Sequence, residues 1–179
     1  TTAGLPALRQ QIAESWSNYQ DGLNSDNVCI TMSGTNAILN LFLTLVNPGD
    51  NVLIPEPYFP LYGPDAKLCG GDAKYYPCRF EDEFVPKVEI LEQLIDENTV
   101  AILYNFPSNP TGGTLNAEQR DALLNFAKKH DLWIITDEVY DRIVFEGEHV
   151  SFMGTGYDKV LLINSFSKTF AMTGWRLGY

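Results

Sequence analysis

The fold is decided by the stretch Trp133-Ile134-Ile135-Thr136-Asp137-Glu138-Val139-Tyr140. Its first residues form a short continuous apolar run, which is typical of a strand buried on both faces of a parallel sheet. In open α/β sheets, ligands bind beyond the carboxyl ends of such strands. Asp137 and Tyr140 stand at that end, three residues apart, so we predict that both point into one crevice. Taken singly, Asp137 could equally be a solvated loop residue or a helix cap, and Tyr140 a core residue.

Similar apolar runs alternate with helical patterns along the whole chain. The runs predict further strands at 28–31, 51–54, 74–76, 100–104 and 159–164. The intervening patterns predict helices at roughly 36–46, 59–68, 87–96 and 117–130. Asn116 and Gln119 form a capping-box pattern at the start of the last helix. Strands and helices in alternation predict a doubly wound α/β fold.

The composition is that of an ordinary soluble domain. The 179 residues suffice for one domain with a sizeable core. Its 23 acidic and 12 basic side chains give a formal net charge of -11, so the surface repels nucleic acid and anionic membranes. The chain has no apolar run of about 20 residues and no signal-peptide pattern. Its three cysteines fit neither a metal spacing nor a disulfide framework. We therefore predict a cytoplasmic protein without nucleic-acid, membrane or metal partners.

Polar residues also follow the other predicted strands. Ser33-Gly34-Thr35 stands where a strand leads into a helix, and free N–H groups at a helix start bind phosphate well. A simple N-cap fits the same residues. Asn109-Pro110-Thr111-Gly112 follows another strand and would by itself be a tight turn.

Lys168 follows the last predicted strand, and Arg176 comes eight residues later. A lysine among apolar neighbours has a lowered pKa and can form a Schiff base. The segment is not a nucleotide-binding P-loop, because that motif needs glycine where Ser167 and Leu162 stand. A dinucleotide fingerprint is also absent from the sequence.

These segments together resemble the class I/II, fold-type I aminotransferases, which depend on pyridoxal 5'-phosphate, and are closest to the bacterial aspartate aminotransferase-like branch. The run 165–179, which reads SFSKTFAMTGWRLGY, resembles the lysine segment of that family. The segments 109–112 and 137–140 match in the same order, and Gly4-Leu5-Pro6-Ala7-Leu8-Arg9 resembles an early segment. Each motif alone is weak, but their order and separation are specific.

The resemblance implies a domain organisation. Residues 1–179 would form the large, cofactor-binding domain, without the N-terminal segment and the C-terminal small domain of the family. Its sheet would be mostly parallel, with about seven strands, the last antiparallel, and helices on both faces.

The resemblance also implies a role for each candidate residue. Lys168 would form the Schiff base with the cofactor and later move a proton, and Asp137 would face the pyridine nitrogen. The phenolic oxygen would accept hydrogen bonds from Tyr140 and Asn109. The phosphate would be bound by Gly34, Thr35, Ser165 and Arg176, with assistance from Ser167. Phe59 would stack on the ring, at a position where the aspartate-preferring branch usually has tryptophan.

The implied function is transfer of an amino group from an L-amino acid to a 2-oxo acid by a cytoplasmic homodimer. Without the small domain, the arginine that grips the substrate carboxylate is missing, so we expect the 179-residue chain itself to be inactive. Three alternatives stay open: a carbon–sulfur or carbon–carbon lyase that uses the same cofactor, an aminotransferase-like regulatory domain, and an inert fragment. The sequence contains no DNA-binding segment, which disfavours the regulatory domain.

Overall fold

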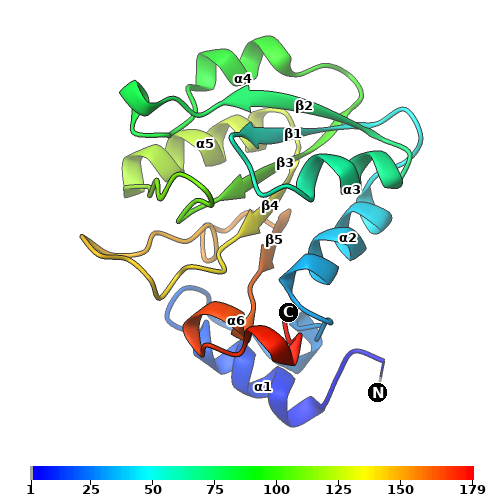
Figure 1. Ribbon diagram of the computed structural model, residues 1–179, viewed down its shortest axis with the longest axis vertical. Helices are drawn as coiled ribbons and strands as arrows, with labels where there is room; N and C mark the ends of the chain where they lie inside the picture. The colour runs from blue at the N-terminus through cyan, green and yellow to red at the C-terminus, as the bar shows by residue number, and fades with distance from the viewer. Residues whose placement is uncertain (1) are drawn as a thin grey trace.

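The computed structural model describes residues 2–179 and has a parallel sheet at its centre (Figure 1). Its five strands are β1 (Asn51–Glu56), β2 (Asp72–Pro77), β3 (Thr99–Asn105), β4 (Trp133–Asp137) and β5 (Val160–Ile163). They are ordered β2-β1-β3-β4-β5, and every neighbouring pair is parallel. The helices are α1 (Pro6–Ser15), α2 (Gly34–Leu45), α3 (Tyr62–Leu68), α4 (Val88–Leu94), α5 (Ala117–Lys129) and α6 (Phe166–Thr169). The α/β fold predicted from the sequence is confirmed.

The number of strands differs from the expected seven. Within residues 2–179 the sheet has five strands, and the strand predicted at 28–31 is reduced to one antiparallel bridge between Thr31 and Gly178. Gly178 forms a second antiparallel bridge with Ser165. The chain at Gly178 thus runs antiparallel to both neighbours, as the resemblance implied for the last strand. Pairing at single residues is too short to make either segment a regular strand.

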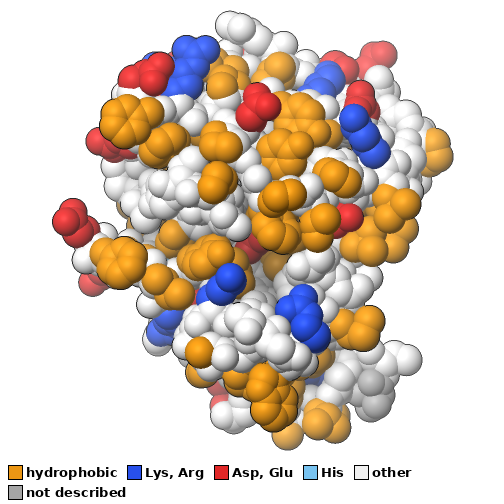
Figure 2. Space-filling model, viewed as in Figure 1, with side chains coloured by type: hydrophobic (Ala, Val, Ile, Leu, Met, Phe, Trp, Pro, Cys, Tyr) orange, Lys and Arg blue, Asp and Glu red, His pale blue; other side chains and the backbone are white. Residues whose placement is uncertain are grey.

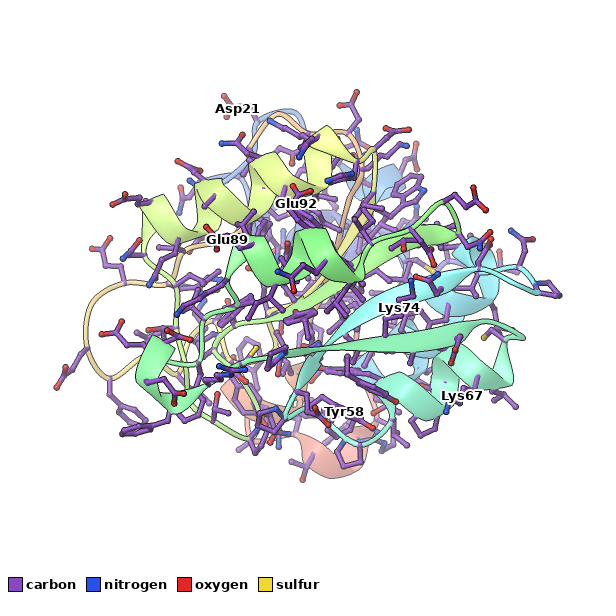
Figure 3. All side chains as sticks on the ribbon, turned by 90° about the horizontal axis from the view of Figure 1, so that it is seen from above. Asp21, Tyr58, Lys67, Lys74, Glu89 and Glu92 are labelled. Carbon is purple, nitrogen blue, oxygen red and sulfur yellow. The ribbon has the colours of Figure 1, made fainter. Side chains whose placement is uncertain are left out.

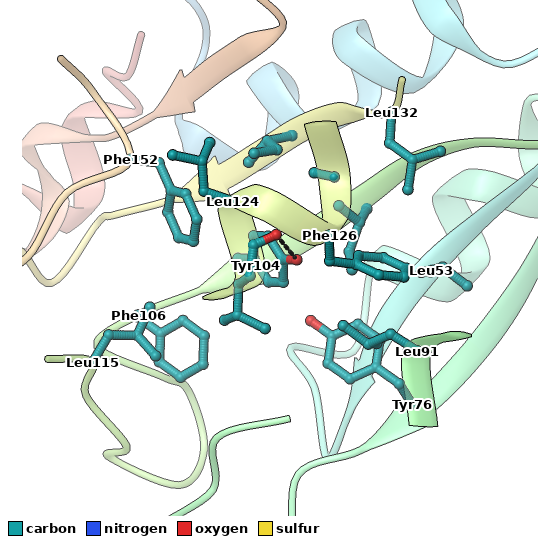
Figure 4. Close-up of a cluster of buried hydrophobic side chains, with 14 of the residues drawn as sticks. Leu53, Tyr76, Leu91, Tyr104, Phe106, Leu115, Leu124, Phe126, Leu132 and Phe152 are labelled. Atoms are coloured by element: carbon teal, nitrogen blue, oxygen red, sulfur yellow. Dashed lines mark hydrogen bonds between the residues drawn. The ribbon is translucent and has the colours of Figure 1, made fainter. Parts of the chain in front are cut away.

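Strands β1, β3 and β4 are buried on both faces, which is why they read as continuous apolar runs. On one face, Leu53 and Ile102 pack with side chains of α4 and α5, including Leu91 and Phe126 (Figure 4). The Tyr104 hydroxyl on this face donates to the Leu123 carbonyl at 3.2 Å, as the dashed line in Figure 4 marks.

On the other face, alternate strand residues pack against α2 and α3, which lie on the opposite side of the sheet from α4 and α5 (Figure 1). Phe42 of α2 is fully buried there, against strand residues such as Val52 and Leu103. The two cores fix the sheet between helical layers and so set the positions of the strand ends.

Helix α5 begins as the sequence predicts. The Asn116 side chain accepts a hydrogen bond from the Gln119 amide, and the Gln119 side chain accepts one from the Asn116 amide, both at 2.8 Å. At the other end of α5, His130 and Lys129 pair with Glu92 of α4, which Figure 3 labels between the two helices. Helices α1 and α6 were not predicted from the sequence, and α6 has only four residues.

Candidate active site

A pocket of about 240 Å³ lies at the carboxyl ends of the parallel strands. Asn105 and Asp137 end β3 and β4 and are paired in register, and the segment of Lys168 follows β5. Figure 2 shows Lys and Arg side chains over the region of α6, below hydrophobic side chains that gather across this face. All ten candidate residues from the sequence line this pocket: Gly34, Thr35, Phe59, Asn109, Asp137, Tyr140, Ser165, Ser167, Lys168 and Arg176.

Asp137 is the buried charge of the pocket, with 6% of its surface exposed. Its Oδ2 accepts a hydrogen bond from the Tyr62 hydroxyl at 2.7 Å, and its Oδ1 accepts one from the Val139 amide at 3.2 Å. Burial raises the pKa of this carboxyl to about 6, although the two donated hydrogen bonds oppose the shift. The site therefore holds an acid whose ionised form is stabilised further by any cation that binds beside it.

Asn105 holds the loop after β3 against Asp137. Its Nδ2 donates to the Asp137 carbonyl at 2.9 Å, and its Oδ1 accepts from the Asn109 amide at 2.8 Å. Because one buried amide side chain bridges both segments, Asn109 and Asp137 keep a fixed separation in the pocket.

Lys168 lies on α6, whose first turn is capped by Ser165: the Ser165 Oγ accepts from the Ser167 amide at 3.2 Å. The Lys168 ammonium lies 5.5 Å from the centre of the Tyr140 ring, so the two predicted catalytic side chains are neighbours. Lys168 is exposed. The sequence-based argument that apolar neighbours surround it is therefore wrong, since the side chain reaches out of the short helix into the open pocket.

The first residues of α2 line the same pocket as Arg176. Ser33 precedes the helix with φ 92°, and within residues 2–179 its side chain accepts no capping hydrogen bond from the first turn. The simple N-cap interpretation of 33–35 is therefore wrong, and the first amides of α2 are left for another acceptor. The hydroxyls of Ser165 and Ser167 and the guanidinium of Arg176 line the same pocket.

Gly178 sets the position of this helix start. A Cβ on Gly178 would lie only 2.4 Å from the Gly34 nitrogen and the Ser33 carbonyl carbon. The same residue exchanges backbone hydrogen bonds with Thr31, at 2.8 and 3.0 Å. Only glycine allows the backbones to approach this closely, so the segment that carries Arg176 also fixes the start of α2.

Sequence reasoning did not identify Tyr62 as a site residue, and it placed Asn105 at a strand end of the site without giving it a role. Tyr62 lies inside a helical pattern, where a tyrosine is interpreted as a buried core residue. Nothing in the sequence indicates its contact with Asp137. Asn105 begins the polar segment 105–112, which directly follows an apolar strand run, but its hydrogen bonds to both segments could not be read from the sequence. Ser33, Ile38, Val139 and Thr173 complete the pocket wall.

Comparison with known proteins decides the family. The sequence pattern of the family described as "Aminotransferase class I and II" matches residues 1–179, which is the whole chain. The chain belongs to the class I and II aminotransferases. This family uses pyridoxal phosphate, so the predicted resemblance and cofactor are confirmed.

Individual members of the family are similar over almost the whole chain. The aspartate/prephenate aminotransferase of Thermus thermophilus is 36% identical over 179 residues, which cover 99% of this chain and 46% of the relative. The aspartate aminotransferase of Pyrococcus horikoshii is 37% identical, with the same coverage. The chain thus spans about half the length of the curated relatives it matches.

Solved aminotransferase structures have the same fold. A single mutant of Thermus thermophilus aspartate aminotransferase gives a TM-score of 0.95 at 34% identity, covering 99% of this chain and 47% of the other. The aromatic aminotransferase of Pyrococcus horikoshii gives 0.94 at 35% identity, covering 99% and 48%. Across residues 2–179, the helices are too short or too polar for any to cross a membrane.

Proposed function

We propose that residues 1–179 are the large, cofactor-binding domain of an aminotransferase that moves an amino group from an L-amino acid to a 2-oxo acid. The single observation that carries this proposal is the composition of one pocket. Lys168, Asp137, Tyr140 and the uncapped start of α2 all line it. A lysine that can bond covalently, a buried carboxylate and a phosphate-binding helix start are the groups that pyridoxal phosphate requires.

The groups at the Arg176 end of the pocket fit a phosphate. The first amides of α2, at Gly34 and Thr35, offer N–H donors at the positive end of a 12-residue helix. Ser165 and Ser167 add hydroxyls, and the planar fork of Arg176 suits a dianion. We assign these residues to phosphate binding.

The groups around Asp137 fit a protonated ring nitrogen. A cation beside Asp137 would form a charge-assisted hydrogen bond and lower the pKa of this buried carboxyl from about 6. The cofactor, when bound, supplies an electron sink for bond breaking at the substrate Cα. Lys168 would hold the cofactor covalently and, as a free amine, carry the proton at Cα. Tyr140 and Asn109 would donate hydrogen bonds to the phenolic oxygen.

The substrate class that we propose is that of the aspartate aminotransferase-like branch. Among eight similar proteins, the names of seven mention aspartate and the name of one mentions aromatic amino acids. Phe59 lies in the pocket and meets Tyr62 edge to face, with ring centres 5.5 Å apart. The Phe59 ring offers a stacking surface but no N–H donor. The preference of this site for aspartate should therefore be weaker than that of a site with tryptophan at this position.

Product analysis tests the proposed reaction. The full-length protein with pyridoxal phosphate should convert 2-oxoglutarate to glutamate when aspartate, alanine or an aromatic amino acid is supplied. Release of ammonia or of a thiol from a sulfur amino acid, without glutamate formation, would replace the proposal with a lyase. Absence of any reaction and of cofactor binding would leave an inert or regulatory domain.

We also propose that the 179-residue chain alone binds the cofactor without turnover, because it spans less than half the length of the relatives. The working enzyme would be a cytoplasmic homodimer. Sedimentation of the full-length protein should give twice the mass of one chain, and a monomer with full activity would contradict this arrangement.

A further inference from the structure

Tyr62 is a pocket residue without a role in the proposed function. It is the first residue of α3, has 1% of its surface exposed and lines the pocket beside Asp137. Its hydroxyl donates to the Asp137 Oδ2 at 2.7 Å, which is a short, charge-assisted hydrogen bond. Strand β4 and helix α3 are thus joined at the one buried charge of the site.

The surroundings of Tyr62 keep its hydroxyl in this place. Its ring packs edge to face against Phe59, and its amide donates to the Phe59 carbonyl at 3.2 Å. The next residue, Gly63, lies so close to Tyr75 that an added Cβ would be 2.3 Å from the Tyr75 hydroxyl. Close packing on both sides leaves the Tyr62 side chain little freedom to turn to another acceptor.

The bond has a fixed direction. Burial and the neighbouring Asp137 raise the pKa of the Tyr62 phenol well above its ordinary value, so the phenol keeps its proton and remains the donor. The Val139 amide donates to the other carboxylate oxygen at 3.2 Å. Each oxygen therefore has one donor from the protein, and the remaining lone pairs are oriented by those two bonds.

We propose that Tyr62 is a positioning residue that keeps Asp137 ionised and aims its free lone pairs into the pocket, where they meet the ring nitrogen of the cofactor. The inference rests on the proposed function for the ring nitrogen, but the Tyr62–Asp137 bond itself does not. Other groups act on Asp137 too: the adjacent Glu138 disfavours its charge, and Lys168 and Tyr140 line the same pocket.

The first test is a titration of the Asp137 carboxyl in the cofactor-free protein. Carboxyl carbon NMR with labelled aspartate follows the midpoint, and Asp137→Asn identifies the signal. Tyr62→Phe should raise the midpoint from about 6 by roughly one pH unit, because a hydrogen bond to the charged form is lost. Tyr76→Phe is the matched control, since Tyr76 is buried but donates to the Leu103 carbonyl, at 2.6 Å and away from this pocket. An unchanged midpoint in Tyr62→Phe would overturn the proposal.

A second measurement keeps the hydroxyl and guards against misfolding of Tyr62→Phe. Replacement of Tyr62 by 3-fluorotyrosine makes the phenol a stronger donor, so the Asp137 midpoint should fall. A midpoint that rises or stays constant would contradict the proposal.

The third measurement links Tyr62 to the cofactor. With pyridoxal phosphate labelled at the ring nitrogen, nitrogen NMR of the loaded protein should show a smaller protonated fraction in Tyr62→Phe than in wild type at pH 8. Equal fractions in both proteins would refute the proposed effect on the cofactor. If wild type does not bind pyridoxal phosphate, the proposed function fails, while the carboxyl titration still decides whether Tyr62 controls Asp137.

Discussion

The substitution Asp137→Asn tests the electrostatic account of the pocket through stability. Burial raises the pKa of Asp137 from 3.8 to about 6 in the folded, cofactor-free protein. The folded state therefore binds this proton more tightly than the unfolded chain does. The contribution of Asp137 to the free energy of unfolding is fully present below pH 4 and is lost as the pH rises through about 6.

The magnitude follows from the same shift. Each unit of difference between folded and unfolded pKa corresponds to about 1.4 kcal/mol. Between pH 4 and pH 7, wild type should lose about 2 kcal/mol relative to Asp137→Asn, which does not titrate. The substitution also disturbs the hydrogen bonds from Tyr62 and Val139. That cost is nearly the same at both pH values, so it cancels from the comparison.

Urea unfolding of the cofactor-free protein at pH 4 and pH 7 measures this difference. The matched control is Asp21→Asn, an exposed carboxylate at the surface (Figure 3), whose effect should be small and similar at both pH values. If the Asp137→Asn effect is the same at pH 4 and pH 7, the carboxyl is not destabilised by burial, and the argument is wrong.

Two further substitutions, and a second measurement on Asp137→Asn, have definite expected outcomes. In Gly178→Ala, the added methyl group should clash with the backbone of Ser33 and Gly34 and displace the start of α2. Calorimetry should then show that the affinity for pyridoxal phosphate falls at least tenfold, whereas the affinity for pyridoxal changes little. Equal losses for both would contradict phosphate binding at α2. Phe42→Ala should lower the free energy of unfolding, measured by urea unfolding, by about 3–5 kcal/mol, because the Phe42 side chain is fully buried. A change below about 1 kcal/mol would refute the place of Phe42 in the core. In the full-length protein, Asp137→Asn should retain part of the cofactor affinity but slow amino transfer by orders of magnitude in a coupled assay, since asparagine cannot stabilise a positive ring nitrogen. Activity within a few-fold of wild type would remove Asp137 from the mechanism.

The strand ends and the residues that follow them could be predicted from the sequence. Continuous apolar runs marked β1, β3 and β4 because both of their faces are buried, and chain order alone brought Asp137 and Lys168 to the same sheet edge. The capping box at Asn116 predicted the start of α5, because its hydrogen bonds join residues only three positions apart.

Contacts between residues far apart in the chain could not be predicted from the sequence. The pairing of Tyr62 with Asp137 joins residues 75 positions apart and depends on how α3 packs on the sheet. The approach of Gly178 to the start of α2 depends on the antiparallel bridge between Thr31 and Gly178, which joins the two ends of the chain. Likewise, the exposure of Lys168 depends on the short helix α6, which was not predicted from the sequence.

The central claim is that Lys168 holds pyridoxal phosphate in this pocket. Borohydride reduction of the loaded protein, followed by proteolysis and mass spectrometry, fixes the cofactor to the lysine that carries it. The account predicts a pyridoxyl group on the peptide that contains Lys168, and its loss in Lys168→Ala. A pyridoxyl group on another lysine, such as Lys74 or Lys159, in protein that binds the cofactor stoichiometrically, would contradict it.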